Sequence, residues 1–278
     1  IGLAQAGATV VVNDMAGALD KSDVLAEIEA AGSKGVAVAG DISARSTADE
    51  LVATADSLGG LAIVVNNAGI TRDKMLFNMT DEDWDAVIAV HLRGHFLLTR
   101  NAATYWRAKA KESADGKVYG RIVNTSSEAG LAGPVGQANY GAAKAGITAL
   151  TLTAARGLSR YGVRANAIAP RARTAMTADV FGEAPQLADG EVDALSPEHV
   201  VNLVRFLASP ASEAVNGQLF IVYGPTVTLV AAPSVERQFT ADASAWTAAD
   251  LDSTLRKYFA DRDPDLGFSA TALMAAGD

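Results

Sequence analysis

The sequence predicts an α/β fold with a single doubly wound parallel sheet that is flanked by helices. Short apolar runs rich in β-branched residues, such as TVVV and LAIVV, are typical of strands buried on both faces. Stretches with helical spacing of apolar residues alternate with these runs. A length of 278 residues and a hydrophobic content of 49% suffice for a large core, so we expect one domain rather than two.

The composition excludes several classes of partner and site. A net charge of −9 and an isoelectric point near 4.9 argue against nucleic acid or an anionic membrane as the main partner, because both need a clustered basic face. The absence of cysteine excludes disulfides and thiolate chemistry, and we expect no metal site. The apolar start lacks the basic leading region of a signal peptide, and no apolar run is long enough to span a membrane, so we predict a cytoplasmic protein.

Residues 1–7 are predicted to be the end of a helix that stops at Gly7, and residues 9–13 are predicted to be a buried strand. Asp14 follows at the carboxyl end of that strand. In a nucleotide-binding sheet, a carboxylate at this place accepts hydrogen bonds from the adenosine ribose and repels a 2′-phosphate, which favours NAD over NADP. The alternative is a solvated aspartate in a turn.

The next part of the chain repeats this pattern of helix and strand. We expect a helix over residues 21–31, a strand from Gly35, and a helix that begins near Ser43 and has Asp41 as a candidate cap. The strand LAIVV then leads to a turn of four residues, Asn66, Asn67, Ala68 and Gly69. The small residues of this turn allow the backbone to approach a cofactor, and its first asparagine is placed to cross-link neighbouring strands.

A long helix is predicted from Thr80, because TDED supplies a cap and early negative charge and apolar residues follow at helical spacing. His91 lies on this helix within AVHLRGHF. An imidazole both donates and accepts hydrogen bonds, so two interpretations remain open: a member of the site, or a buried structural histidine.

The stretch from Arg121 to Gly146 carries the candidate catalytic residues. RIVNT predicts a strand, and Ser127 follows its carboxyl end, where open α/β sheets build their sites. Tyr140 and Lys144 are four residues apart and lie on one face of the next predicted helix. Taken alone, a tyrosine and a lysine at this spacing favour an exposed pair.

The chemistry of these three side chains fits proton transfer at an alcohol or a ketone. A free phenol has a pKa of ~10, and a nearby cation lowers that pKa by favouring the phenolate. We therefore expect Lys144, together with an oxidised nicotinamide ring, to lower the pKa of Tyr140. On this hypothesis Ser127 holds the substrate oxygen, Tyr140 transfers the proton, and Lys144 also holds a ribose hydroxyl.

The remaining chain completes the sheet and adds a tail. The helix over residues 145–160 has apolar side chains on more than one face, which predicts a partner surface and a homo-oligomer. A strand around residues 164–169 leads to Pro170 and then to Arg171 and Arg173, for which salt bridges and contacts to the phosphates of a coenzyme A thioester both remain open. We further expect a substrate loop over 175–195, a helix over 197–207, QLFIV as the last strand, and a helix over 248–259.

The serine spacing, the YGAAK motif and the run GAAKAG together resemble the active-site signature of the short-chain dehydrogenase/reductase family. The resemblance implies a Rossmann-like fold, a nicotinamide cofactor, and a homodimer or homotetramer. It implies that Asp41 lies beside the adenine ring and that Asn67, Ala68 and Gly69 approach the cofactor. It also implies that Thr174, which follows Pro170, meets the nicotinamide carboxamide or a phosphate.

The resemblance assigns a specific place to His91. The family commonly has an asparagine there, which orders a proton-carrying water near the active lysine, and an imidazole is able to maintain such a relay. The motifs VVVND, VHLRGHF, GQANYGAAKAG, PRARTAMT and NGQLF resemble the (3R)-hydroxyacyl-CoA dehydrogenase part of peroxisomal-type multifunctional enzymes and their bacterial stand-alone relatives. This branch implies acyl-CoA or steroid-derived thioester substrates. A 3-oxoacyl-carrier-protein reductase is the alternative, although that group usually uses NADPH, against the expectation from Asp14.

One departure from the family is large, because its first strand and its T-G-x-x-x-G-x-G turn, which receives the pyrophosphate, are absent from the sequence. We expect residues 1–222 to be an N-terminally incomplete catalytic domain, with residues 223–278 as an extension packed on it. An omitted segment is favoured over a true deletion, because loss of a central strand would leave neighbouring edges unpaired around a hydrophobic gap. A catalytically silent assembly subunit is the alternative from another functional class.

Overall fold

The computed structural model describes residues 1–174, 176–177, 182, 185, 192–263, 267–268 and 270. The chain forms two compact units, residues 1–230 and residues 231–278. The described strands all belong to the first unit, which also carries the predicted site residues.

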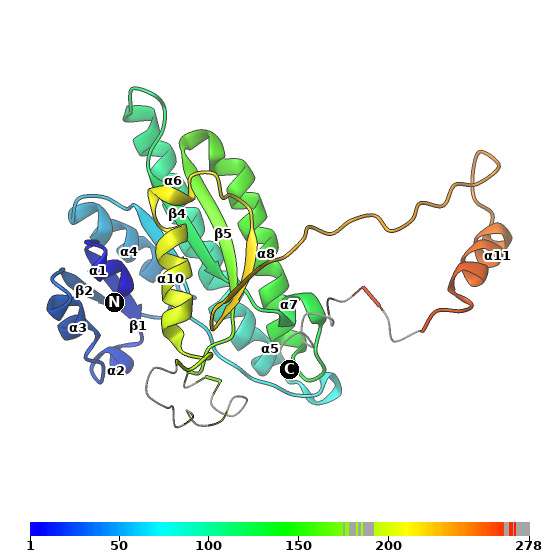
Figure 1. Ribbon diagram of the computed structural model, residues 1–278, viewed down its shortest axis with the longest axis horizontal. Coiled ribbons are helices and arrows are strands. Elements are labelled where there is room, and N and C mark those ends of the chain that lie inside the picture. The colour runs from blue at the N-terminus through cyan, green and yellow to red at the C-terminus, as the bar shows by residue number, and fades with distance from the viewer. Residues whose placement is uncertain are drawn as a thin grey trace. The chain divides into compact units, whose positions relative to one another are not determined.

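The strands of the first unit form two sheets where one was expected. The strands are β1 Val10–Asp14, β2 Gly35–Ala39, β3 Ile63–Asn66, β4 Gly120–Thr125, β5 Val163–Pro170, β6 Leu219–Tyr223 and β7 Thr226–Leu229. β1 and β2 form a parallel pair, and the larger sheet has the order β3-β4-β5-β6-β7 (Figure 1). The larger sheet is parallel from β3 to β6, whereas β7 is antiparallel to β6.

The prediction that QLFIV is the last strand was wrong, because β7 follows β6 after a tight turn. Gly224 makes this turn with φ 49°, a conformation that favours glycine. β7 lies beyond the predicted boundary at residue 222, so the unit that contains the sheet continues to Val230. The packing of the C-terminal extension on the catalytic domain stays a prediction.

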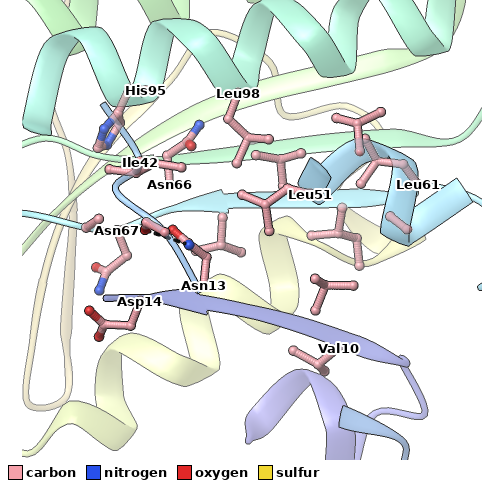
Figure 2. A pocket seen from close by; sticks show the side chains of 18 of the residues that line it. Val10, Asn13, Asp14, Ile42, Leu51, Leu61, Asn66, Asn67, His95 and Leu98 are labelled. Carbon is pink, nitrogen blue, oxygen red and sulfur yellow. Dashed lines mark hydrogen bonds between the residues drawn. The ribbon is translucent and has the colours of Figure 1, made fainter. Parts of the chain in front are cut away.

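A gap separates the two sheets. In the described part of the chain, β1 pairs only with β2, and β3 pairs only with β4. The second edge of β1 and the second edge of β3 therefore have no partner strand among the described residues. A cavity of about 770 Å³ lies between these edges, and Val10, Val11 and Val64 are among the residues that line it (Figure 2).

Helices flank the strands in the order that the sequence predicts. Their bounds are α1 Gly2–Gln5, α2 Ala16–Leu19, α3 Val24–Ala30, α4 Arg45–Ser57, α5 Asp81–Ile88, α6 Gly94–Glu112, α7 Ala129–Ala132, α8 Ala138–Leu158, α10 Pro197–Leu207 and α11 Ala248–Phe259. Thr80 caps α5 as predicted, since its Oγ1 accepts from the Asp83 backbone nitrogen at 3.2 Å. A π-helical segment, Ala89–Arg93, joins α5 to α6. No helix in the described part of the chain is long and apolar enough to cross a membrane.

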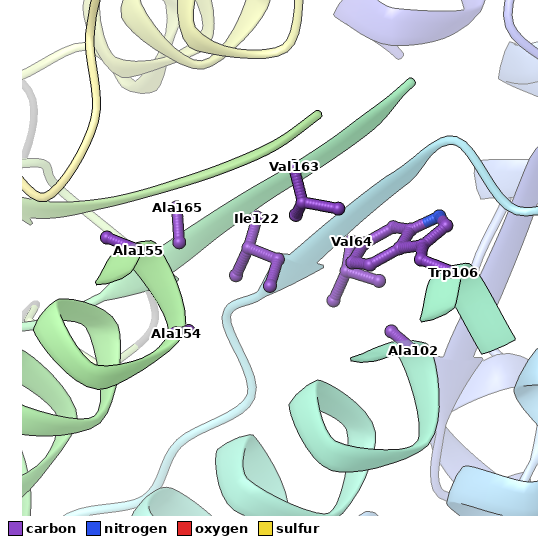
Figure 3. Packing of buried hydrophobic residues seen from close by; sticks show 8 residues of the cluster. All are labelled: Val64, Ala102, Trp106, Ile122, Ala154, Ala155, Val163 and Ala165. Carbon is purple, nitrogen blue, oxygen red and sulfur yellow. The ribbon is translucent and has the colours of Figure 1, made fainter. Parts of the chain in front are cut away.

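Consecutive residues of β4 point to opposite faces of the sheet and join different cores. Ile122 packs with residues of α6 and α8, including Trp106 and Ala154, and Figure 3 shows this cluster. Val123 packs on the other face with Leu203 and Leu207 of α10. The larger sheet is therefore covered by helices on both faces, which fixes the carboxyl end of β4 where the predicted site lies.

The second unit contains α11, whose bounds match the predicted helix over 248–259. Thr247 caps this helix, because its Oγ1 accepts from the Asp250 backbone nitrogen at 3.2 Å. The Tyr258 ring makes an edge contact with Phe239 at a centroid distance of 4.9 Å, and the Tyr258 hydroxyl donates to Glu236 at 2.8 Å.

Candidate active site

Ser127, Tyr140 and Lys144 lie together beside the carboxyl end of β4. Ser127 follows β4, and the other two residues lie one turn apart in the first part of α8. A hydrogen bond joins the side chains of Ser127 and Tyr140. The Lys144 Nζ atom donates to the Thr125 carbonyl oxygen at 2.7 Å and lies 5.3 Å from the centroid of the Tyr140 ring. The structure therefore brings the three predicted side chains together.

Close packing of α7 against α8 determines where Lys144 lies. A Cβ atom on Gly130 would lie 2.6 Å from the Ala145 backbone nitrogen and 2.8 Å from the Lys144 carbonyl carbon, so a side chain does not fit there. Ser126 supports the same arrangement, because its Oγ donates to the Lys144 carbonyl oxygen at 3.0 Å.

Burial controls the charge of Lys144. The residue is 2% exposed, and desolvation of its ammonium lowers its pKa from 10.5 to about 7. The ammonium and the neutral amine are therefore both populated near neutral pH.

The pKa of Tyr140 is raised above its ordinary value of 10.0, so the prediction of a lowered pKa was wrong for this structure. Burial of the ring is the main cause, because it disfavours the phenolate. The hydrogen bond from Ser127 lowers the pKa, and the charge of Asp73 raises it. The ammonium expected to stabilise the phenolate is itself partly neutral, since Lys144 is buried as well.

His91 contacts both the candidate catalytic residue Tyr140 and the turn after β3. Its ring packs edge-on against the Tyr140 ring at a centroid distance of 5.2 Å. Its Nε2 atom lies 2.8 Å from the Ile70 carbonyl oxygen and 3.0 Å from the Ile70 nitrogen. Burial and the charge of Lys144 lower the pKa of His91 to about 4, so the imidazole is neutral at pH 7. Its Nδ1 atom has no hydrogen-bond partner within the described residues.

The asparagine turn after β3 is tied to β4, as predicted. The Asn66 Nδ2 atom donates to the Asn124 Oδ1 atom at 2.8 Å, and Asn67 Oδ1 accepts from the Thr125 hydroxyl at 3.0 Å. The sequence predicted small residues in this turn to let a cofactor approach. Gly69 is also needed for packing, because a Cβ atom there would lie 2.3 Å from the His91 ring. The turn and the catalytic strand therefore form one hydrogen-bonded unit.

Five predicted cofactor residues, at or just after the carboxyl ends of β1, β2 and β3, line the cavity between the sheets: Asp14, Asp41, Asn67, Ala68 and Gly69. Figure 2 shows Asp14 and Asn67 at this cavity. The Asp14 Oδ1 atom accepts from the Met15 nitrogen at 2.7 Å, and Asp41 Oδ1 accepts from the Ser43 nitrogen at 2.8 Å. Asp41 does not cap α4, because Ala44 occupies the N-cap position. Carboxylate acceptors at these strand ends fit the hydroxyl groups of an adenosine ribose.

Pro170 and Thr174 do not line this cavity. Pro170 ends β5, and the Thr174 backbone nitrogen donates to the Thr177 hydroxyl at 2.8 Å. Most of the expected substrate loop over residues 175–195 lies outside the described residues, so the roles of Pro170 and Thr174 stay predictions.

Both arginines that follow β5 form salt bridges, one of the two interpretations left open by the sequence. Arg171 makes a two-pronged ion pair with Glu128, with both nitrogen–oxygen distances at 2.7 Å. Arg173 lies 3.4 Å from Asp193. Each guanidinium group therefore has an acidic partner within the protein. Contact between these arginines and the phosphates of a coenzyme A thioester stays a prediction.

His95 was missed by the sequence analysis, although it lies four residues after His91. It lines the cavity, is 2% exposed, and its Nε2 atom has no hydrogen-bond partner within the described part of the chain. Burial and the positive charges nearby lower the pKa of His95 to about 3. The repeat of histidine at helical spacing is the signal that could have identified it.

Residues 1–184 match the family model of the short chain dehydrogenases. The hydroxyacyl-CoA dehydrogenase ChsB1 of Mycobacterium tuberculosis is 72% identical over 278 residues, which cover 99% of this chain and 88% of that protein. The peroxisomal multifunctional enzyme type 2 of Mus musculus is 42% identical over 80% of this chain, which spans 29% of that enzyme. The crystal structure of a short chain dehydrogenase from Mycobacterium avium has a TM-score of 0.82 and 41% identity, and the match covers 97% of this chain and 92% of that one.

These similarities agree with the geometry on two points. The family match includes the carboxyl end of β4 and the first part of α8, where Ser127, Tyr140 and Lys144 lie. The solved structure confirms the predicted α/β fold with a parallel sheet flanked by helices. The chain therefore belongs to the short-chain dehydrogenase family and is an oxidoreductase that acts on CH–OH groups with a nicotinamide cofactor.

Proposed function

We propose that the enzyme interconverts a 3-hydroxyacyl and a 3-oxoacyl thioester of coenzyme A, with NAD as the cofactor and a steroid-derived acyl group as a compatible substrate. The observation that carries the proposal is the cluster of Ser127, Tyr140 and Lys144 beside β4. The choice of thioester is supported by the 72% identity to a protein named a hydroxyacyl-CoA dehydrogenase.

The cofactor proposal depends on the acceptors in the cavity between the sheets. When bound, the cofactor accepts a hydride from the carbinol carbon or returns it to the ketone. Asp14 would hold the adenosine ribose and Asp41 would lie beside the adenine, while Asn67, Ala68 and Gly69 would border the cofactor. A carboxylate at Asp14 repels the 2′-phosphate of NADP, which supports NAD.

Ser127 and Tyr140 act on the substrate oxygen. In the oxidative direction Tyr140 removes the hydroxyl proton as the carbinol carbon loses its hydride, and in the reductive direction it returns that proton. The Ser127 hydroxyl holds the same oxygen, and its hydrogen bond to Tyr140 lowers the pKa of the phenol.

Lys144 and His91 both lie beside the Tyr140 ring and are proposed to support its proton transfer. Lys144 lies 5.3 Å from the centroid of the Tyr140 ring, and with a pKa of about 7 it is protonated in part of the molecules near neutral pH. It would also hold a ribose hydroxyl of the cofactor. The neutral His91 ring limits the movement of Tyr140, and its free Nδ1 atom supports the proposed role in a proton relay.

The proposal also includes a homo-oligomeric assembly and a cytoplasmic location. A homodimer or homotetramer is supported by α8, whose exposed positions include the small apolar residues Ala142, Ala145 and Ala149. A cytoplasmic location fits the similarity to a bacterial hydroxyacyl-CoA dehydrogenase.

The test is NAD-dependent oxidation of 3-hydroxyacyl-CoA thioesters by the full-length protein, with straight-chain and steroid-derived acyl groups compared. Replacing Tyr140 by phenylalanine removes the proton-transferring oxygen and is expected to lower kcat by about 10²-fold or more. Turnover unchanged in this variant would refute the mechanism. Faster reduction of an acyl-carrier-protein thioester with NADPH would instead support the 3-oxoacyl-carrier-protein reductase, an activity named for a relative 40% identical to this chain.

A further inference from the structure

We propose that the ion pair between Glu128 and Arg171 positions Ser127 for catalysis, so that both residues are positioning residues of the reaction. This inference rests on the proposed function, because it assigns Ser127 a role in holding the substrate oxygen. The pair joins two loops at the carboxyl edge of the sheet, one after β4 and one after β5.

The geometry of the pair is rigid. The Arg171 Nε and Nη2 atoms each donate to a different oxygen of Glu128, and both distances are 2.7 Å. The two side chains are 17% and 13% exposed, respectively, so water screens the pair only partly. A two-pronged contact of this kind fixes direction as well as distance.

Arg171 is itself held by β6. Its backbone nitrogen donates to the Val222 carbonyl oxygen at 3.0 Å, and its guanidinium carbon lies 4.7 Å from the centroid of the Tyr223 ring. Glu128 is therefore tied to a side chain that is anchored on two neighbouring strands.

Glu128 transmits this constraint to Ser127 through one peptide bond. It occupies the N-cap position of α7, and its carbonyl oxygen accepts from the Leu131 and Ala132 nitrogens at 2.9 Å. The Ser127 Oγ atom accepts from the Ala129 nitrogen at 3.2 Å in the same turn. Releasing the Glu128 side chain would free the loop that carries the serine hydroxyl, and a displacement of about 1 Å in a site can cost ~10²-fold in rate.

The chain offers a matched control at the other end of β5. Arg164, near the start of that strand, forms an ion pair with Glu213, and its side chain is 18% exposed. Arg164→Gln thus breaks an arginine–carboxylate pair on the same strand, far along it from the serine loop, in which the arginine is partly buried and the Glu213 side chain is 59% exposed. A general effect of weakening β5 would appear in this variant too.

The experiment compares kcat for Arg171→Gln, Glu128→Gln and Arg164→Gln in the wild-type background and in a Ser127→Ala background. The first two variants are expected to lower kcat at least 10-fold in the wild-type background with little change in KM for NAD. In the Ser127→Ala background they should lower kcat no further, because they act through the serine. Arg164→Gln should leave kcat within about twofold in both backgrounds.

Two further variants keep the test decisive if Arg171→Gln folds poorly. Arg171→Lys keeps the positive charge but not the two-pronged contact, and an intermediate loss of kcat is expected. The exchanged pair Glu128→Arg with Arg171→Glu should recover part of the lost kcat. Wild-type kcat in Arg171→Gln or Arg171→Lys, or an equal loss in both serine backgrounds, would overturn the inference. Full activity of Ser127→Ala would instead refute the proposed function, so the two failures are distinguishable.

Discussion

Replacing Lys144 by methionine is expected to stabilise the cofactor-free protein at neutral pH while removing its activity. Burial lowers the pKa of Lys144 from 10.5 to about 7, and each pKa unit corresponds to ~1.36 kcal/mol. The buried ammonium therefore costs on the order of 4 kcal/mol of unfolding free energy at pH 7. Loss of the hydrogen bond to the Thr125 carbonyl oxygen offsets ~1–2 kcal/mol, which leaves a net gain of about 2–3 kcal/mol.

The pH dependence of this gain gives the sharper test. Because the folded pKa lies below the unfolded one, the unfolded chain binds more protons at Lys144 between pH 7 and pH 10.5. The wild-type protein therefore becomes more stable with rising pH in that window, relative to Lys144→Met. The difference in unfolding free energy should shrink by about 1.4 kcal/mol per pH unit between roughly pH 7.5 and 9.5.

Urea denaturation of both proteins across this window measures the difference directly. Lys109→Met is the control, because the charge of Asp56 raises the pKa of Lys109, and its removal should give a difference that stays flat over the same window. A difference for Lys144→Met that is also flat, or a variant less stable than wild type at pH 7, would show that burial does not control this lysine.

The other predictions concern the cofactor side and the support of the site. Asp14→Ala should raise KM for NAD about 10-fold and reduce the preference for NAD over NADP. This preference is measured as kcat/KM with NAD divided by kcat/KM with NADP, and an unchanged ratio would exclude Asp14 as the ribose acceptor. Gly130→Ala should lower the unfolding free energy by about 1–3 kcal/mol and reduce kcat, because the added Cβ atom would clash with the α8 backbone. Gly157→Ala is the control: a Cβ atom at residue 157 would have no neighbouring atom within 4 Å, so this variant should be as stable as the wild type or slightly more stable. Asn124→Ala should lower the unfolding free energy by about 1–3 kcal/mol, because it removes the buried hydrogen bonds of Asn124 with Asn66 and Thr151; an unchanged Tm would contradict this.

The strands, and the placing of Ser127, Tyr140 and Lys144 together, were predictable from the sequence because both depend on local patterns. The β-branched runs identify β1, β3 and β4, and the four-residue spacing places Tyr140 and Lys144 on one face of α8. The helices at residues 197–207 and 248–259 were predicted with their bounds, since Pro197 marks the start of the first and the Thr247 cap marks the start of the second.

The features that were missed depend on contacts between distant residues. Arg171 meets Glu128 across 43 residues, so no local pattern selects this pair over a phosphate ligand. β7 has four residues, and only its pairing with β6 distinguishes it from a tail. The raised pKa of Tyr140 results from the extent of its burial, which is fixed by the packing of the whole site rather than by the neighbouring lysine alone.

The arrangement of strands separates the two tasks of the site within the chain. The proposed proton-transfer side chains come from a single strand–loop–helix segment that begins at β4, whereas Asp14 and Asp41, proposed for the adenosine half of the cofactor, lie at or just after the ends of β1 and β2. On this proposal, a substitution at Asp14 or Asp41 changes contacts to the adenosine half without altering the segment that carries Ser127, Tyr140 and Lys144. The preference between NAD and NADP is therefore open to engineering at residues distant in the chain from the proposed proton-transfer side chains.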